Sequence, residues 1–98
     1  MADRIIVWSR QALDDIDEAC GYVGQSGDSS ASALAYRIEY LVGALLEHPY
    51  IGRKIPEYDQ ENLRERITNN FRILYRLSPT EIEIIGIFHS RKMLPEEI

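Results

Sequence analysis

The sequence predicts an α+β fold in the order β-α-α-β-β-β, with a helical hairpin packed on one face of a small antiparallel sheet. Two stretches of the first half repeat apolar residues with the period of a helix. Three short segments of the second half carry the pattern of strands. The chain has 98 residues, the length of one domain over 1–98, so a single small fold must bury all of these elements.

The first strand is expected over 5–8, a β-branched and aromatic run that ends at Trp8. Ser9 is a candidate helix cap. A helix is predicted from there to Gly24, because apolar residues recur at spacings of three and four. Its stripe consists of Leu13, Ile16, Cys20 and Val23, widened by Ala12 and Ala19. The acidic residues lie off this stripe, which makes the helix amphipathic.

The second helix is predicted from about Ser30 to Glu47, with Asp28 or Ser29 as its cap. Its apolar stripe is Ala31, Leu34, Ile38, Leu41 and Leu45. Tyr36 and Tyr40 fall on the opposite side, one turn apart. They are either exposed aromatics that cover their own helix or the loop after it, or a contact surface for a partner protein.

Proline and glycine predict a connecting segment over 49–62. Strands are then expected over 63–67, 71–77 and 81–88, joined by turns at 68–70 and 78–80. The nearly continuous apolar run 82–88 is typical of a strand buried on both faces. We expect the first strand to lie at the sheet edge or beside the last strand.

The charge is uneven along the chain. The net charge of −5 belongs to residues 1–50, which carry 3 basic and 8 acidic residues, whereas residues 51–98 carry 8 of each. The acidity excludes a protein that coats nucleic acid by charge alone and permits a local arginine-lined site. Arg64, Arg66, Arg72 and Arg76 alternate with other residues in two adjacent strands. They predict either a basic patch opposite the helices or a solvated face offset by glutamates.

Other chemistries have little support in the sequence. Cys20, the single cysteine, allows no intrachain disulfide and lies on a core stripe, so we expect a buried, inert thiol. His48 and His89 stand at unrelated positions, so no metal site is predicted, and no cofactor is expected. His48 follows a helix and is interpreted as structural. The absence of a long apolar run predicts a cytoplasmic protein without a membrane partner.

Three stretches resemble the RelE/ParE superfamily of toxins from type II toxin–antitoxin systems, most closely its ParE branch. The first is Trp8-Ser9 followed by Ala12, Asp15, Ile16 and Tyr22. The second runs from Pro49 through Gly52-Arg53 to Pro56-Glu57. The third contains Leu63-Arg64-Glu65 and Phe71-Arg72-Ile73-Leu74-Tyr75-Arg76, and closes with Ile87-Phe88-His89 and Arg91.

The resemblance implies a small toxin held inactive by a cognate antitoxin, expected to be of the ribbon–helix–helix type. ParE members poison DNA gyrase, and RelE members cleave mRNA on the ribosome. Arg72 and Arg91 match arginines of the nuclease branch, and His89 could act as acid or base. The tail lacks the tyrosine typical of those nucleases.

The ParE-like expectation is therefore a gyrase-binding poison. The alternatives are an mRNA endonuclease that uses Arg72, His89 and Arg91, or a non-toxic member that retains antitoxin binding. The candidate contacts to antitoxin or target are Arg64, Arg66, Arg72, Arg76, Tyr36, Tyr40, Arg91 and Lys92. No sequence-specific DNA binding is expected of this chain alone.

Overall fold

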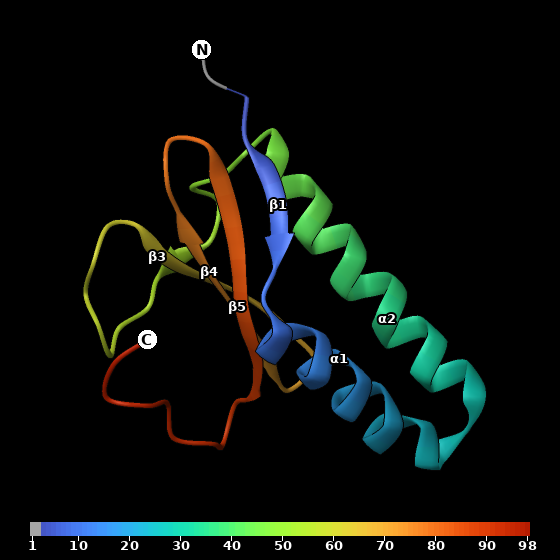
Figure 1. The fold of residues 1–98 in the computed structure, drawn as a ribbon. Helices are drawn as coiled ribbons and strands as arrows, with labels where there is room; N and C mark the ends of the chain where they lie inside the picture. Colours follow the sequence, from blue (N-terminus) through green and yellow to red (C-terminus); the bar gives the residue numbers. More distant parts are fainter. Residues whose placement is uncertain (1–2) are drawn as a thin grey trace.

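The computed structural model describes residues 3–98, in which two helices cover one face of a five-stranded sheet (Figure 1). The helices are α1 (Arg10–Val23) and α2 (Asp28–Gly43), each continued by a short 3-10 turn, Gly24–Ser26 and Ala44–Leu46. The strands are β1 (Ile5–Trp8), β2 (Arg53–Lys54), β3 (Leu63–Thr68), β4 (Phe71–Leu77) and β5 (Glu81–His89). The predicted α+β fold is confirmed.

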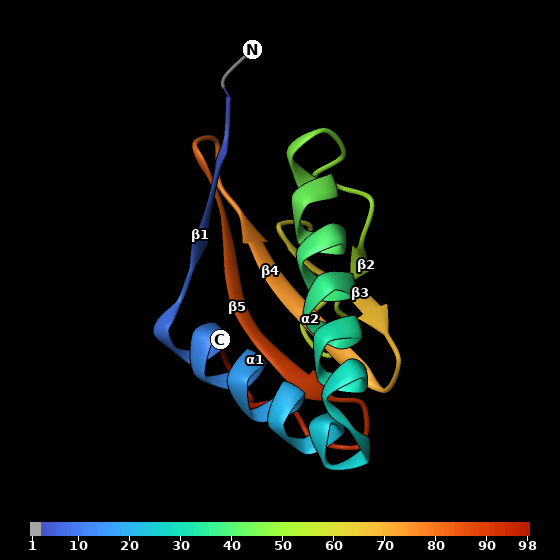
Figure 2. The same ribbon diagram turned by 90° about the vertical axis from the view of Figure 1, so that its right-hand side faces the viewer.

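The strand order is β1-β5-β4-β3-β2, so the first strand lies beside the last, as expected. β1 runs parallel to β5, whereas the other neighbours are antiparallel, which makes the sheet mixed rather than wholly antiparallel. The physical reason is the connection: β1 feeds the helical hairpin and not a β-hairpin turn, so no tight turn fixes its direction. The helical hairpin carries the chain from one edge of the sheet to the other (Figure 2).

Two apolar clusters hold the layers together, one on each face of the sheet. The larger lies under the helices and contains fully buried Ile38, Leu45, Ile73 and Ile84. The smaller lies on the helix-free face around Ile55, Leu63 and Leu74, where Leu94 and Ile98 of the C-terminal segment pack onto it. The helix side of β5 is therefore buried, whereas Ile85 and Phe88 on its other face are half-buried, so the strand that its apolar run predicted to be buried on both faces is fully buried on one.

The start of α1 extends the hydrogen bonding of β5 beyond the end of β1. The Ser9 hydroxyl accepts the Ala12 amide at 3.0 Å and donates to the Ile85 carbonyl at 2.8 Å. One turn further, Asp15 accepts the Ile87 amide at 2.9 Å. Ala12 is fully buried. The residues of the Trp8–Ile16 motif thus fasten α1 to the sheet.

The ends of α2 differ from the prediction. The helix begins at Asp28 without a side-chain cap, so neither Asp28 nor Ser29 caps it. Gly27 occupies the N-cap position with φ +134°, a backbone conformation that glycine adopts without strain, and it makes the turn between the helices. The regular helix ends at Gly43 rather than Glu47, because the chain tightens into the 3-10 turn.

Two further details were not predicted. Leu13 is 44% exposed, because the buried side of α1 is centred on Ala12 and Ala19 instead. The segment expected to be loop contains β2, whose two residues pair with Arg64 and Glu65 of β3. Within residues 3–98, no helix has the length and apolarity needed to cross a membrane.

Candidate functional site

The arginines of β3 and β4 lie on both faces of the sheet. Arg64 stands opposite Tyr75, a residue of the core beneath the helices, and Arg66 shares that side of β3. Arg72 and Arg76 alternate with Tyr75 along β4 and lie on the helix-free face. The single basic patch opposite the helices, one of the two alternatives that the sequence left open, is therefore wrong.

The length of the turn explains this difference. The prediction placed three residues, 68–70, in the turn, which would pair even-numbered residues of one strand with even-numbered residues of the other. In the structure Thr68 pairs with Phe71, so the turn has only Asn69 and Asn70, and Asn69 adopts a positive φ of 52°. Even-numbered residues of β3 therefore face odd-numbered residues of β4.

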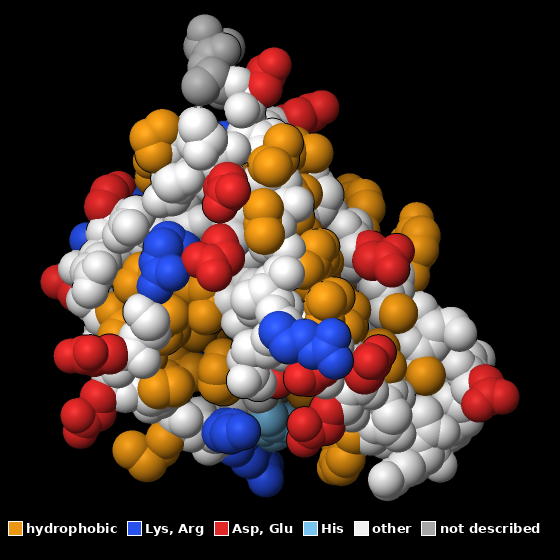
Figure 3. All heavy atoms as spheres, viewed as in Figure 1, with side chains coloured by type: hydrophobic (Ala, Val, Ile, Leu, Met, Phe, Trp, Pro, Cys, Tyr) orange, Lys and Arg blue, Asp and Glu red, His pale blue; other side chains and the backbone are white. Residues whose placement is uncertain are grey.

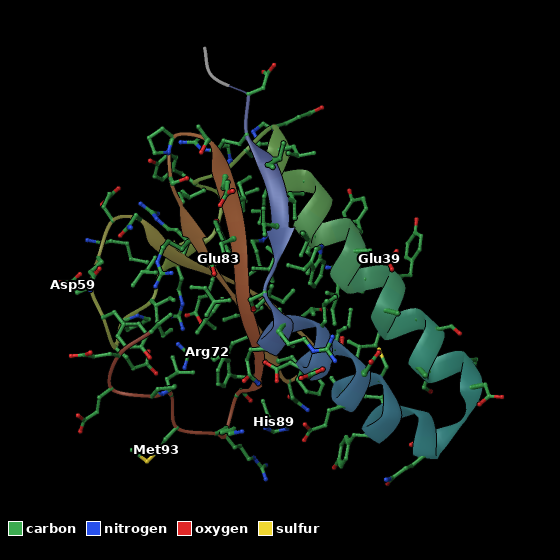
Figure 4. All side chains as sticks on the ribbon, in the orientation of Figure 1. Glu39, Asp59, Arg72, Glu83, His89 and Met93 are labelled. Atoms are coloured by element: carbon green, nitrogen blue, oxygen red, sulfur yellow. The ribbon has the colours of Figure 1, made fainter. Side chains whose placement is uncertain are left out.

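Arg72 is the centre of an ion-pair network on the helix-free face. Its Nε donates to Glu65 at 2.5 Å, and its Nη1 and Nη2 donate to the two oxygens of Glu57 at 2.7 and 2.8 Å. Arg53 donates to the other Glu65 oxygen at 2.6 Å. Glu65 is 1% exposed and Arg72 8% exposed, so the centre of the network is buried, whereas Arg53 and Glu57 reach solvent. We call Arg53, Glu57, Glu65 and Arg72 the Arg72 network; Figure 4 shows Arg72 on the side of the sheet that the C-terminal segment crosses.

The network fixes the charges of its members. The two hydrogen bonds from Arg72 lower the pKa of Glu57 to about 2, against the opposing effect of burial. The same bonds, together with Glu65, raise the pKa of Arg72 above its ordinary value. All three kinds of nitrogen on this guanidinium donate to carboxylates. An incoming phosphate would have to compete with two carboxylates already in place.

The two arginines on the helix side differ in their contacts. Arg64 donates to the side chain and carbonyl of Glu61 and to the Gly52 carbonyl, and its guanidinium lies 5.1 Å from the centre of the Tyr50 ring. Arg66 has a buried Nη1 with no hydrogen-bond partner among the described residues. Arg64 thus ties the Tyr50–Gly52 segment to β3, whereas no such contact holds Arg66 within residues 3–98.

Arg76 lies at the rim of a groove on the helix-free face. It donates to Glu83 at 2.9 Å and to the Ile98 carbonyl at 2.7 Å. The groove has a volume of about 580 Å³ and runs between β5 and the C-terminal segment, with Ile85 and Phe88 in its floor. In Figure 3 the surface over β5 and the C-terminal segment is hollowed; hydrophobic side chains line the hollow, and basic and acidic side chains surround it.

The residues proposed for nuclease chemistry do not converge. His89 stands opposite Phe71 in the β4–β5 ladder, with ring centroids 5.5 Å apart, on the helix side of the sheet. Arg72 stands opposite Phe88 on the other side. The His89 Nδ1 accepts a hydrogen bond from the backbone amide of Arg91 at 3.1 Å, so this nitrogen is engaged within the turn that follows β5.

A second, smaller cavity adjoins His89. It has a volume of about 180 Å³ and lies between α1 and the end of β5. Glu18 and Tyr22 come from the helix, and Phe71 and Lys92 complete the wall near His89. Lys92 also places its ammonium 5.8 Å from the centre of the Phe88 ring. Arg91 and Lys92 are exposed.

The two tyrosines of α2 are exposed as predicted, Tyr36 at 72% and Tyr40 at 61%. Cys20 is half-buried against the helical core, and burial raises the pKa of its thiol, with Asp17 and Glu39 adding to the effect. The thiol is therefore a poor nucleophile. Across residues 3–98, no group of three His, Cys, Asp or Glu side chains could hold a metal ion.

Sequence reasoning missed Glu57, Glu65 and Tyr75. Glu65 occupies an inward position between Leu63 and Ile67, and a carboxylate at such a position signals a buried partner. Tyr75 is fully buried, accepts the Gly52 amide at 3.0 Å and donates to the Pro49 carbonyl at 2.8 Å. It fastens the Pro49–Gly52 segment of the second motif to the sheet.

The helical hairpin on a five-stranded sheet is the fold that the resemblance to the RelE/ParE superfamily implies. The family model described as ParE toxin of type II toxin-antitoxin system, parDE, matches residues 6–94. The chain belongs to this family of ParE toxins.

Individual relatives agree with this assignment. The chain is 29% identical to "Putative toxin Y4kP" of Sinorhizobium fredii, over 98% of each chain. Its fold is similar to a chain of the chromosomal ParDE system of P. aeruginosa, with a TM-score of 0.74 and 21% identity over 89% of this chain and 96% of that one. It is also similar to a chain of the toxin–antitoxin complex RelBE2 of Mycobacterium tuberculosis, with a TM-score of 0.62 and 18% identity over 91% and 93%.

Proposed function

We propose that this ParE-family toxin acts in the cytoplasm by binding DNA gyrase and blocking supercoiling, with no bond chemistry of its own. We further propose that a cognate antitoxin of the ribbon–helix–helix type neutralises it, and that such a pair stabilises the replicon that encodes it. The family assignment supports the toxin–antitoxin part of this proposal.

The observation that carries the binding mechanism is the separation of Arg72 from His89. Metal-independent RNA cleavage needs a basic group and a general acid or base gathered on one phosphate. Here the two side chains lie on opposite faces of the sheet, and Arg72 already binds two carboxylates. This geometry favours a poison that binds over one that cuts.

The test is induced expression of the toxin alone, with plasmid supercoiling and transcript integrity followed in the same cells, and purified gyrase assayed with purified toxin. We expect relaxed plasmid with intact transcripts. His89→Ala is the test variant: it should keep gyrase inhibition, whereas a nuclease that uses His89 as acid or base would lose activity. Cleaved transcripts with normal supercoiling would establish the endonuclease alternative.

Normal supercoiling, intact transcripts and normal growth would instead indicate a non-toxic member that retains antitoxin binding. In either case, contact with the antitoxin is expected at exposed groups. Arg91 and Lys92 offer exposed cations at the end of β5, and Tyr36 and Tyr40 offer aromatic area on α2. Arg91→Glu with Lys92→Glu should weaken the complex and reduce its salt dependence.

A further inference from the structure

The two carboxylates that bind Arg72 differ in their exposure. Glu65 comes from the middle of β3, its side chain is 0% exposed, and it accepts the Nε hydrogen bond at 2.5 Å. Glu57 comes from the segment between β2 and β3, its side chain is 43% exposed, and it accepts the hydrogen bonds of Nη1 and Nη2. Glu65 therefore orients the guanidinium from inside the fold, whereas Glu57 covers its outward end.

We propose that Glu57 is an internal ligand in an oxyanion-binding site formed by Arg72 and Arg53, and that a phosphate or carboxylate group of another molecule binds there when Glu57 is absent or displaced. Paired N–H donors of a guanidinium match two oxygens of a carboxylate or of a phosphate. In this structure the carboxylate in that position belongs to the chain itself. The site is independent of the gyrase mechanism, because it is defined by what Arg72 can bind and not by what the toxin inhibits.

The charges of the Arg72 network select an anion. Two arginines and two glutamates give +2 and −2, so the site is neutral while Glu57 occupies it. Without Glu57 the sum is +2 and −1, or +1, since Glu65 still binds both arginines. Arg53 uses only its Nε in hydrogen bonds within residues 3–98, and its side chain is 59% exposed. Its other donors are therefore available to a further oxygen of a phosphate.

Glu57 can leave this position without breaking a strand. It lies in the connection 55–62 between β2 and β3, and within residues 3–98 its main chain forms no hydrogen bond with another main-chain group. Its pKa is lowered to about 2, chiefly by the hydrogen bonds from Arg72, so it stays ionised at neutral pH. A competing anion, and not protonation, must then release Arg72. In the wild-type chain Glu57 thus limits the binding of phosphate groups at Arg72.

The experiment titrates the full-length toxin with inorganic phosphate at neutral pH and constant ionic strength, and follows the backbone amide signals around residue 72 by NMR. Glu57→Ala should bind phosphate saturably, with a Kd about 5-fold or more below that of wild type, because the internal competitor is gone. Asp59→Asn is the matched control. It removes the same charge from the same connection, but Asp59 pairs with Lys54 and lies apart from Arg72 in Figure 4.

Arg72→Lys in the Glu57→Ala background tests the paired donors. Lysine keeps the charge but lacks the planar pair of N–H groups, so the gain in phosphate binding should disappear. If Glu57→Ala binds phosphate no more tightly than Asp59→Asn does, or if its gain survives Arg72→Lys, the proposed site is overturned. If Glu57→Ala does not fold, Glu57→Gln is measured in its place, since glutamine keeps the size of the side chain and removes the charge that competes with phosphate.

A parallel titration with acetate distinguishes the two sources of the oxyanion. Binding of phosphate but not of acetate by Glu57→Ala would assign the site to phosphoryl groups. Acetate bound as tightly as phosphate, or more tightly, would assign it to carboxylates such as those of a partner protein. Either result requires the same loss of binding in Arg72→Lys.

Discussion

Arg72→Met removes the cation that lies between two carboxylates on the helix-free face. Glu65, only 1% exposed, would keep Arg53 at 2.6 Å as its one charged partner. Removing one member of a buried ion pair costs about 3–5 kcal/mol, because the other charge stays buried without full compensation. Since Arg53 remains and Glu57 reaches solvent, we expect the lower end, about 3 kcal/mol. That is a large share of the roughly 5–15 kcal/mol by which such domains are stable.

The assay is urea unfolding followed by far-UV circular dichroism, on a cycle of Arg72→Met, Glu65→Leu and the double variant. The double variant removes both buried charges and leaves Arg53 and Glu57, whose side chains are 59% and 43% exposed. We expect it to unfold within about 1 kcal/mol of wild type, with a coupling of at least about 2 kcal/mol. Two results would refute a structural role for the network. One is a loss in the free energy of unfolding below about 1 kcal/mol for Arg72→Met, and the other is a double variant whose loss equals the sum of the two single losses.

Three further predictions concern Glu57, two glycines and the cap of α1. Because the pKa of Glu57 is lowered to about 2, its pairing with Arg72 stabilises the fold above the ordinary carboxyl pKa, and this stabilisation is lost as pH falls from about 5 towards 2. The side chain is 43% exposed, so solvent screening limits the loss in the free energy of unfolding to about 1 kcal/mol; unfolding measured at each pH should show this loss in wild type and not in Glu57→Gln. Gly52→Ala should cost at least about 2 kcal/mol or prevent folding, whereas Gly43→Ala should raise the Tm by a few degrees; equal melting temperatures would contradict the packing seen at 52. Ser9→Ala removes the cap of α1 and a bond to β5, which should lower the free energy of unfolding by about 1–2 kcal/mol, with Ser9→Thr as the conservative control.

The sequence predicted the elements that are long enough to show a period. Each of the two helices covers several turns, and β3, β4 and β5 are six to nine residues long, so their apolar spacing is visible. β2 has only two residues, which is too short for an apolar–polar alternation to be visible, so the strand is defined only by its pairing with β3. The start of α2 depends on the positive φ of Gly27. Glycine can adopt this φ, but the sequence does not show that it does so here.

The candidate site depended on a relation between strands, and that relation could not be predicted. Alternation assigns faces within one strand, but one residue more or less in a turn reverses the pairing of two strands. The two-residue turn at Asn69 and Asn70 therefore separates Arg64 from Arg72, although both were assigned correctly to strands. The ion partners of Arg72 come from two other segments of the chain, and no local pattern connects them.

The distribution of charge partners bears on where this toxin makes contact. The arginine that the superfamily resemblance associates with chemistry is bound on three nitrogens by Glu57 and Glu65, and Arg64 and Arg76 are bound to carboxylates and carbonyls. A group already committed to the fold gains little from a new partner, because the old contacts must first be broken. We therefore expect recognition at side chains that the fold leaves exposed, such as Tyr36 and Tyr40 on α2. A poison that works by binding needs such a surface, and a nuclease needs the opposite: free cations gathered around one phosphate.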